Sequence, residues 1–265
     1  MKIDIKMKKY RNKVIPALED IHLEFQEGEN ILVIGTSGAG KSTLLKCILD
    51  TTTFEGCVDT DRETIAYIPQ HPALNPDLSV YETIFFSIKF SQTDRKHKNE
   101  DVDRLTDYYI NEVALGDVKY CQCKRLSGGQ MQRVSIAKEL ARGKSVIIAD
   151  EIDTGLDCGV ARHIVKTLCD ITHRFDMTHR KKLTTIVVSH NLVNVDLYDK
   201  IVVLVKPSGC SGQVAFFGTP IEAKFFFGVD NYVDILTKLN NKDEGGEGKA
   251  EYYIRKFKRY YAHII

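Results

Sequence analysis

The segment that most constrains this chain is Gly35 to Thr43, which reads GTSGAGKST. It fits the pattern G-x-x-x-x-G-K-[ST], in which glycines let the backbone N–H groups turn inward around a phosphate. The apolar run Ile31 to Ile34 predicts a buried strand before the loop, and Leu44 to Leu49 predicts a helix after it. We therefore expect an anion site at a helix N-terminus. Lys41 would reach the β- and γ-phosphates of a nucleotide, and the Ser42 hydroxyl would bind Mg²⁺.

Composition narrows the class of protein and its partners. The 265 residues suffice for one large or two small domains, and 37 basic residues nearly cancel 36 acidic ones. Because no overall field favours nucleic acid, we expect no nucleic-acid partner. Seven scattered cysteines favour a reducing compartment, and we interpret the C-x-C pair Cys121 and Cys123 as ordinary thiols. Neither a signal peptide nor a stretch of about 20 apolar residues is evident, so a cytoplasmic protein is expected.

Strand-like and helix-like segments alternate along the chain. Strands are expected in residues 3–25 (two strands), 31–34, 55–59, 64–68, 145–151, 184–189, 200–205 and 213–217, and helices at 44–49, 80–90, 105–115, 131–142 and 160–169. This alternation predicts an α/β fold with a mostly parallel sheet covered by helices on both faces. The pieces at 55–59 and 64–68 predict a small β-subdomain. Residues 91–101 read as an exposed loop and residues 172–182 as a basic loop.

Two carboxylates end the apolar run that begins at Ser145. Asp150 closes the predicted strand, the position at which a phosphate-loop ATPase keeps the carboxylate that holds Mg²⁺, and Glu151 follows it directly. Side chains alternate along a strand, so one carboxylate can face the metal while the other faces an attacking water. By itself, such a pair of acidic residues is common at a solvent-exposed strand end. Because it follows a phosphate loop with every fixed position of the motif present, we favour a role in nucleotide chemistry.

A second phosphate-seeking element is the pentapeptide Leu126 to Gln130, which reads LSGGQ. Its Ser-Gly-Gly turn opens a predicted helix and so presents another helix N-terminus to an anion. As a lone pentapeptide it could be only a helix cap. The chain nevertheless carries two such elements about ninety residues apart.

With these motifs in order, the sequence resembles the nucleotide-binding domain of ABC transporters, a P-loop NTPase of the ABC ATPase type. Leu126 to Gln130 matches the family's signature, Gly35 to Thr43 its Walker A loop and Val146 to Asp150 its Walker B strand. Single residues match the Q-loop (Gln70), the D-loop (Asp157), the switch histidine (His190) and the aromatic that stacks on adenine (Tyr10). The resemblance covers residues 3–206 and implies a mostly parallel core sheet flanked by helices, a small antiparallel β-subdomain and a helical signature subdomain.

The resemblance implies a site that binds ATP and Mg²⁺. The residues it implies for the nucleotide are Tyr10, Gly35, Ser37, Gly38, Ala39, Gly40, Lys41, Ser42, Thr43, Gln70, Ser127, Gly128, Gly129, Gln130 and Asp157. The implied metal ligands are Ser42, Gln70 and Asp150, and the implied catalytic residues are Glu151, His190, Lys41 and Gln70. Glu151 would be the general base for water, and His190 would contact the γ-phosphate. The signature would act on the nucleotide of a second ABC ATPase subunit, in a homodimer or heterodimer.

Two further resemblances favour a transport subunit. Leu78 to Ile84 is similar to the segment of transport ATPases that docks a permease, and residues 213–239 resemble the tail of White-type (ABCG) exporters. A separate integral-membrane permease is then expected, with the chain peripheral on the cytoplasmic face of the membrane. The alternatives are a soluble ABC ATPase of the iron–sulfur assembly or regulatory type, and a non-hydrolysing ATP switch. A long coiled-coil insertion is absent, which excludes the chromosome-maintenance branch.

The expected domain organisation follows from these matches. Residues 1–206 would form the ABC ATPase domain, with the helical signature subdomain at about 75–140 inserted in it. A strand–helix extension at 207–240, a flexible linker at 241–248 and a basic amphipathic helix at 249–265 would follow. That last helix could rest on lipid or a permease, or pack its aromatic side chains on its own domain.

Overall fold

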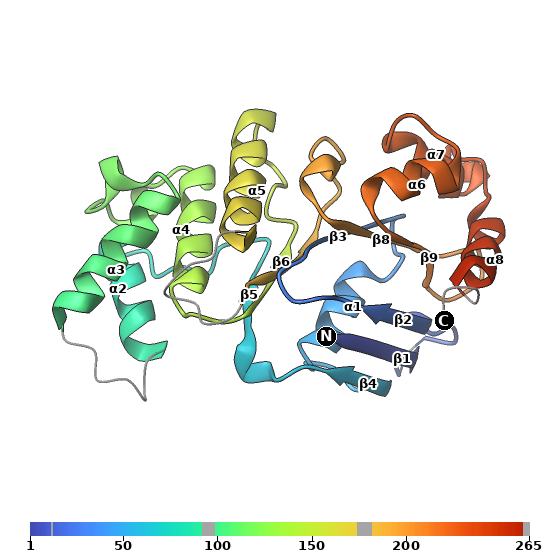
Figure 1. Ribbon diagram of the computed structural model, residues 1–265, viewed down its shortest axis with the longest axis horizontal. Helices are drawn as coiled ribbons and strands as arrows, with labels where there is room; N and C mark the ends of the chain where they lie inside the picture. Colours follow the sequence, from blue (N-terminus) through green and yellow to red (C-terminus); the bar gives the residue numbers. More distant parts are fainter. Residues whose placement is uncertain (12, 92–98, 174–181, 262–265) are drawn as a thin grey trace. The chain divides into compact units, whose positions relative to one another are not determined.

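The computed structural model describes residues 1–11, 13–91, 99–173 and 182–261 (Figure 1). The chain forms two compact units. The first unit joins Met1–Arg62 to Ile186–Ile265, and the second unit is Glu63–Thr185. Strand β7 (Thr184–Val188) lies at the point where the chain passes from the second unit into the first.

The first unit begins with a small antiparallel sheet. Its strands are β1 (Lys2–Lys8), β2 (Leu18–Glu24) and β4 (Glu55–Asp59), in the order β2-β1-β4. Burial alternates over the second half of β2, where Ile21 and Leu23 face the core; Leu18 is also buried, three positions before Ile21. The predicted β-subdomain is therefore present with β4, whereas the second piece predicted for it, at 64–68, pairs elsewhere.

A second group of strands in the first unit carries the phosphate loop. Strand β3 (Asn30–Gly35) pairs in parallel with β8 (Lys200–Val205), which pairs antiparallel with β9 (Gln213–Gly218). All six residues of β3 are buried, as expected of a parallel strand covered on both faces. Helix α1 (Lys41–Ile48) follows β3 after the loop, which confirms the strand–loop–helix order predicted from the sequence.

The C-terminal part of the first unit is helical and aromatic. Helices α6 (Pro220–Phe227), α7 (Val233–Leu239) and α8 (Ala250–Tyr261) gather beside β9 (Figure 1). Thr219 and Glu222 form a capping box at the start of α6, with proline at the first helical position. The segment predicted as a flexible linker carries a 3₁₀ turn, Lys242–Glu244, and backbone hydrogen bonds to the end of α7.

Helix α8 packs its apolar face on its own unit. Tyr253, Ile254 and Phe257 are each about 5% exposed, and the Phe257 and Phe216 ring centroids lie 5.9 Å apart. The Tyr253 hydroxyl donates a 3.2 Å hydrogen bond to the Phe227 carbonyl. Of the two surroundings expected for this helix, its own domain therefore takes the apolar face. Residues 262–265 of the predicted helix lie outside the described residues.

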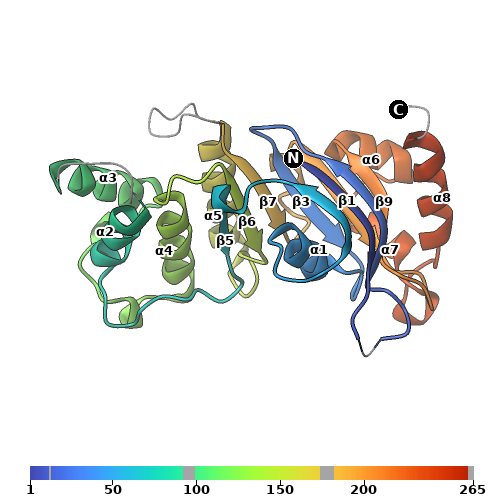
Figure 2. The ribbon, with the colours of Figure 1, turned by 90° about the horizontal axis from the view of Figure 1, so that it is seen from below.

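The described part of the second unit contains a parallel strand pair and a group of helices. Strand β5 (Ile65–Ile68) pairs in parallel with β6 (Val146–Asp150). Helices α2 (Val80–Ser91), α3 (Asn99–Glu112) and α4 (Gly128–Leu140) lie together, and α5 (Cys158–His173) follows β6 (Figure 2). Short 3₁₀ turns elsewhere in the chain lie at Arg62–Thr64, Gly116–Val118, Cys123–Arg125 and Val195–Leu197.

Two predicted loops differ from the structure at their edges. Helix α3 begins at Asn99, inside the segment predicted as an exposed loop, and α5 runs to His173, past the predicted start of the basic loop. The remainder of those loops, 92–98 and 174–181, lies outside the described residues. No helix in the described ranges has both the length and the apolar character needed to span a bilayer.

Candidate nucleotide site

The phosphate loop of the first unit has the backbone that its glycines allow. Gly38 and Gly40 have φ values of 67° and 99°, in the left-handed region that favours glycine. Gly35 closes on the neighbouring strand, where a Cβ atom would lie 2.1 Å from the Leu204 carbonyl oxygen. Gly40 is the N-cap of α1, and no acidic residue occupies the first turn of that helix. The helix N-terminus therefore presents N–H groups without a competing carboxylate, as a phosphate requires.

Lys41 lies against this loop. Its side chain is buried, and Nζ donates hydrogen bonds of 3.0 Å to the Gly35 carbonyl and 3.2 Å to the Thr36 carbonyl. Ser42, the next residue, is exposed at the start of α1. The structure thus holds the ammonium group beside the N-terminus of α1, where it adds positive charge to that of the helix dipole.

Tyr10 also lies beside the start of α1. Its hydroxyl is 3.5 Å from Oγ1 of Thr43, the last residue of the phosphate-loop motif. The Lys8 ammonium lies 4.5 Å from the centre of the Tyr10 ring, a cation–π distance. Lys8 is itself buried and donates to Oγ1 of Thr52 at 2.5 Å and to the Thr53 carbonyl at 2.6 Å. A lysine fixed in this way gives the tyrosine ring a supported position.

His190 follows β7 in the first unit, and its side chain is exposed. The turn around it is built by two hydrogen bonds: the Ser189 N–H donates to the Val33 carbonyl at 3.3 Å, and the Asn191 N–H donates to Ser189 Oγ at 2.8 Å. Val33 belongs to β3, the strand that feeds the phosphate loop. The loop that carries His190 is therefore anchored to that strand.

In the second unit, the predicted metal ligand Gln70 meets the predicted general base. Gln70 Nε2 donates a 2.8 Å hydrogen bond to Glu151 Oε2, and Thr154 Oγ1 lies 3.5 Å from the same oxygen. Glu151 has a φ of 49°, a left-handed conformation that costs a non-glycine residue about 1 kcal/mol. Backbone strain of this kind at a strand end re-aims the side chain, here toward Gln70.

Asp150 ends β6 and contacts Tyr67 of the paired strand. The Tyr67 hydroxyl donates to Asp150 Oδ2 at 3.4 Å. Burial, and then the negative charge of Asp150, raise the pKa of Tyr67, so the hydroxyl stays protonated and remains a donor. Asp150 and Glu151 thus engage different partners, and the left-handed backbone of Glu151, not strand alternation, aims its side chain.

The signature and D-loop segments adjoin within the second unit. Ser127 and Gln130 form a capping box at the start of α4: Ser127 Oγ accepts from the Gln130 N–H at 3.3 Å, and Gln130 Oε1 accepts from the Ser127 N–H at 2.9 Å. A Cβ atom on Gly129 would lie 2.9 Å from Val160, and the Val160 N–H donates to Asp157 Oδ1 at 3.0 Å. Val160 therefore touches both segments. Ser127 and Gly128 are exposed, available to another molecule.

The predicted site residues thus fall into two sets. The first unit holds Tyr10, the loop Gly35 to Thr43 and His190, and the second unit holds Gln70, Asp150, Glu151, Asp157 and Ser127 to Gln130. Sequence reasoning missed Lys8 and Tyr67. Lys8 lies two residues before Tyr10 on a predicted strand, and Tyr67 precedes Gln70 by three residues. The one sequence signal for them was this closeness to predicted site residues. No group of three metal-ligating His, Cys, Asp or Glu side chains occurs among the described residues.

Comparison with protein-family models identifies the family to which the chain, with both sets of site residues, belongs. A family model described as "ABC transporter" matches residues 18–154, more than half of the chain. The chain belongs to the ABC transporter family. The matched segment includes the phosphate loop, Gln70, the signature, Asp150 and Glu151, whereas Tyr10, Asp157 and His190 lie outside it.

Several proteins similar to this chain are named as import ATP-binding proteins. A sulfate/thiosulfate import ATP-binding protein of Rhizobium meliloti (strain 1021) is 32% identical over 219 residues, covering 78% of this chain and 57% of that protein. A methionine import ATP-binding protein of Histophilus somni (strain 129Pt) is 34% identical over 182 residues, covering 63% of this chain and 52% of that protein. The chain therefore spans little more than half the length of these relatives.

Solved structures of ABC proteins share the fold. The structure of cbiO1 from Clostridium perfringens, described as part of the ABC transporter complex cbiONQ, matches with a TM-score of 0.71 at 24% identity, covering 92% of this chain and 96% of that one. An ATP-binding cassette in a dimeric post-hydrolysis state bound to ADP and Pi matches with a TM-score of 0.66 at 24% identity, covering 82% and 97%. The predicted fold is confirmed: a P-loop ABC ATPase fold with a mostly parallel sheet, helices and a small antiparallel subdomain.

Proposed function

We propose that this chain is the ATP-hydrolysing subunit of an ABC transporter and drives transport through a separate membrane permease. Family membership supports a transporter ATPase, and the observation that carries hydrolysis is the 2.8 Å hydrogen bond from Gln70 to Glu151. This contact holds the Glu151 carboxylate, directly after β6, in one orientation through a hydrogen bond from the Gln70 amide. A chain kept only as an ATP-binding switch has no need for such an arrangement.

The residues fit ATP and Mg²⁺. The N-terminus of α1 and Lys41 would hold the phosphates, and the Tyr10 ring would stack on the adenine. The Ser42 hydroxyl, the Gln70 carbonyl oxygen and the Asp150 carboxylate would hold Mg²⁺, which prefers oxygen ligands. Gln70 uses its NH₂ group toward Glu151, so its side-chain oxygen is not the atom engaged in that hydrogen bond. When bound, Mg²⁺ neutralises charge on the β- and γ-phosphates and makes the γ-phosphate a better electrophile.

Glu151 would accept the proton from the attacking water, with Gln70 and Thr154 holding its carboxylate in position. His190 would donate a hydrogen bond to the γ-phosphate and stabilise the charge that develops there. Lys41 would stay on the β- and γ-phosphates throughout. These roles need no covalent intermediate on the protein, since phosphoryl transfer to water is catalysed by positioning and charge.

A second copy of an ABC ATPase subunit would complete each site. The exposed Ser127 and Gly128 support this, because their side of the α4 N-terminus carries N–H groups and no acidic residue in the first turn. In this proposal the signature of one copy contacts the nucleotide on the phosphate loop of the other. Two related solved structures are described as dimers, which supports the same assembly.

The direction of transport rests on separate observations. The tail at 213–239 supports export through its resemblance to White-type exporters, and export is our prediction from it. Import is the second candidate, favoured by the relatives, which are named as import proteins for sulfate/thiosulfate, methionine and maltose/maltodextrin. Reconstitution with the native permease in vesicles, with substrate uptake and efflux measured after adding ATP on one side, separates the two directions.

Phosphate release by the purified chain tests the central activity. Native protein should hydrolyse ATP only with Mg²⁺, and Glu151→Gln should lose at least a hundredfold in turnover while keeping ATP affinity, because only the general base is changed. Glu24→Gln in β2, an exposed carboxylate paired with Lys2, is the matched control and should hydrolyse like the native chain. Native protein that binds ATP without turnover would support the non-hydrolysing switch instead.

A membrane partner separates a transport subunit from a soluble ABC ATPase. Capture of the native chain from its own membranes should recover one polytopic protein in stoichiometric amount. Recovery of soluble iron–sulfur assembly proteins in its place, with the chain absent from the membrane fraction, would favour the soluble alternative.

A further inference from the structure

Two segments of the second unit form a short ladder beside α2. The Val80 N–H donates to the Cys121 carbonyl at 3.1 Å, and the Cys123 N–H donates to the Leu78 carbonyl at 2.9 Å. The Lys124 N–H donates to the Pro76 carbonyl at 3.1 Å, and Ser79 pairs with Gln122 in an antiparallel bridge. Residues 76–80 and 121–124, more than forty positions apart in sequence, therefore run side by side.

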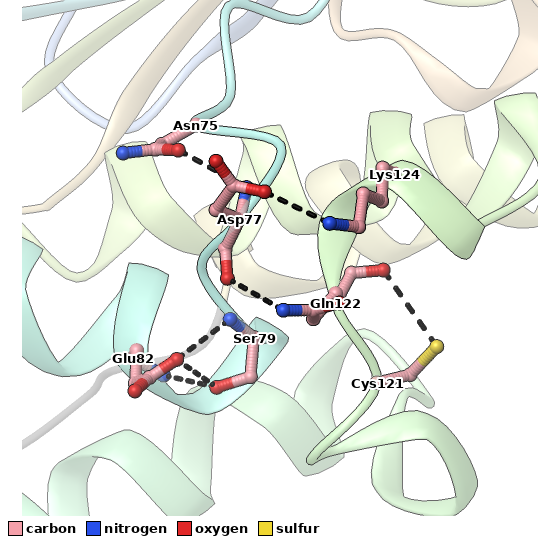
Figure 3. Close-up of polar contacts among 7 residues, drawn as sticks. All are labelled: Asn75, Asp77, Ser79, Glu82, Cys121, Gln122 and Lys124. Atoms are coloured by element: carbon pink, nitrogen blue, oxygen red, sulfur yellow. Dashed lines mark hydrogen bonds and ion pairs between the residues drawn. The ribbon is translucent and has the colours of Figure 1, made fainter.

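Side chains fasten the outer end of this ladder (Figure 3). Lys124 Nζ lies 2.9 Å from Asp77 Oδ1, and Gln122 Nε2 donates to the Asp77 carbonyl at 3.1 Å. The Asp77 N–H donates to Asn75 Oδ1 at 3.1 Å, which fixes the turn that presents Asp77. We refer to Asp77, Gln122 and Lys124 as the clasp.

The inner end of the ladder is packed. Ser79 caps α2 through Glu82, which accepts from the Ser79 N–H at 2.8 Å and from its hydroxyl at 2.7 Å (Figure 3). Buried Thr83 lies 3.5 Å from the buried Cys123 thiol. The start of α2 therefore packs against the segment that leads to the signature. The clasp lies on the exposed side of this contact.

Each strand of the ladder leads to a residue of the proposed mechanism. Gln70, which donates a hydrogen bond to Glu151, lies upstream of the first strand. Pro72 and Pro76 restrict the backbone between Gln70 and that strand. Downstream of the second strand, the 3₁₀ turn Cys123–Arg125 ends where the Leu126 N–H donates to the Cys123 carbonyl, and Ser127 caps α4 directly after it. Only two residues separate Lys124 from Ser127.

We propose that the clasp makes these two segments move as one piece and thereby sets the position of Ser127 to Gln130 for hydrolysis in the second copy. The inference rests on the proposed function. Asp77, Gln122 and Lys124 are positioning residues: they hold one another and the two backbone segments of the ladder. A movement of the segment after Gln70 then reaches the signature through the ladder, and the clasp keeps the ladder in register.

The test is a charge swap across the clasp. Lys124→Asp and Asp77→Lys each place like charges together and should lower kcat about fivefold, the effect expected for an exposed ion pair. The affinity of the subunit for ATP should stay unchanged, because the signature acts on the nucleotide of the other copy. The double variant, Asp77→Lys with Lys124→Asp, should restore kcat to within twofold of native.

Lys2→Asp, which breaks the exposed Lys2–Glu24 pair in the first unit, is the control and should leave kcat unchanged. The inference is overturned if either single variant keeps native kcat, if the double variant is no better than the singles, or if the loss of kcat follows a lowered thermal midpoint. An inactive native chain would instead contradict the proposed function, so the two failures are distinguishable.

Discussion

Gln70 Nε2 lies 2.8 Å from Glu151 Oε2, and Glu151 adopts a left-handed backbone conformation at this contact. The hydrogen bond orients a carboxylate whose backbone the fold already holds in a costly conformation. Beside its proposed role as a metal ligand, Gln70 therefore positions the proposed base.

Loss of the Gln70 amide should lower turnover. We expect Gln70→Ala to reduce kcat by one to two orders of magnitude, because both a metal ligand and the partner of Glu151 are removed. Gln70→Glu keeps an oxygen ligand but places like charge beside Glu151, so it should also be impaired and should recover partly at lower pH. Steady-state phosphate release at several pH values checks this; equal activity of Gln70→Ala and native protein would remove Gln70 from the mechanism.

Lys8 should support ATP binding through Tyr10. Lys8→Met keeps the aliphatic stem but loses the cation over the Tyr10 ring and the hydrogen bonds to Thr52 and Thr53. We expect ATP affinity to fall about threefold to fivefold, the size of one cation–π contact. Lys6→Met on the exposed side of β1 is the control. Calorimetric titration with ATP measures both variants, and equal affinities would show that Lys8 does not act on the nucleotide.

The buried Cys47 of α1 should resist thiol reagents. Burial raises the pKa of the Cys47 thiol to about 11, so at pH 8 it stays a neutral, unreactive thiol. The folded-state pKa lies above the unfolded value, so its stabilising contribution is complete below about pH 8.5 and is lost as pH rises through about 11. Peptide mass mapping after alkylation at pH 8 should find the exposed Cys57 modified and Cys47 intact. Equal labelling of the two in folded protein would contradict this.

Helix α8 should stabilise the first unit. Phe257 is buried against Phe216 and Phe226, so Phe257→Ala should lower the free energy of unfolding by about 3 to 4 kcal/mol. Tyr252→Ala, on the exposed side of the same helix, should change it by no more than about 0.5 kcal/mol. Urea unfolding of both variants provides the measurement. A small effect of Phe257→Ala would mean that α8 is only loosely attached, as a membrane-facing helix would be.

Sequence reasoning predicted the parts of the fold that depend on local chemistry. The glycine-rich loop at Gly35 to Thr43 is specified by residues close together in sequence, and the strand–loop–helix order predicted around it is present. Pairing partners of short strands could not be predicted, because pairing depends on contacts distant in sequence: β4 joins the antiparallel sheet, whereas β5 pairs in parallel with β6. The start of α3 at Asn99 was missed because its first turn is polar and lacks an apolar period.

In the candidate site, too, local motifs could be predicted and long-range contacts could not. Motifs identified Gln70 and Glu151 separately, but the hydrogen bond between them joins residues 81 positions apart and has no local signal. Lys8 and Tyr67 were missed for the same reason: each acts through a partner on another strand or loop. The clasp of Asp77, Gln122 and Lys124 likewise exists only through a long-range ladder.

The central claim is that the phosphate loop is half of a site that a second copy completes through its signature. Complementation between two inactive variants tests this most directly. Lys41→Ala disables the phosphate loop and Ser127→Arg disables the signature, so each alone should hydrolyse ATP at less than a hundredth of the native rate. Mixing them forms heterodimers with one intact loop facing one intact signature, and phosphate release should rise well above the sum of the two. A mixture that stays at that sum would contradict the account.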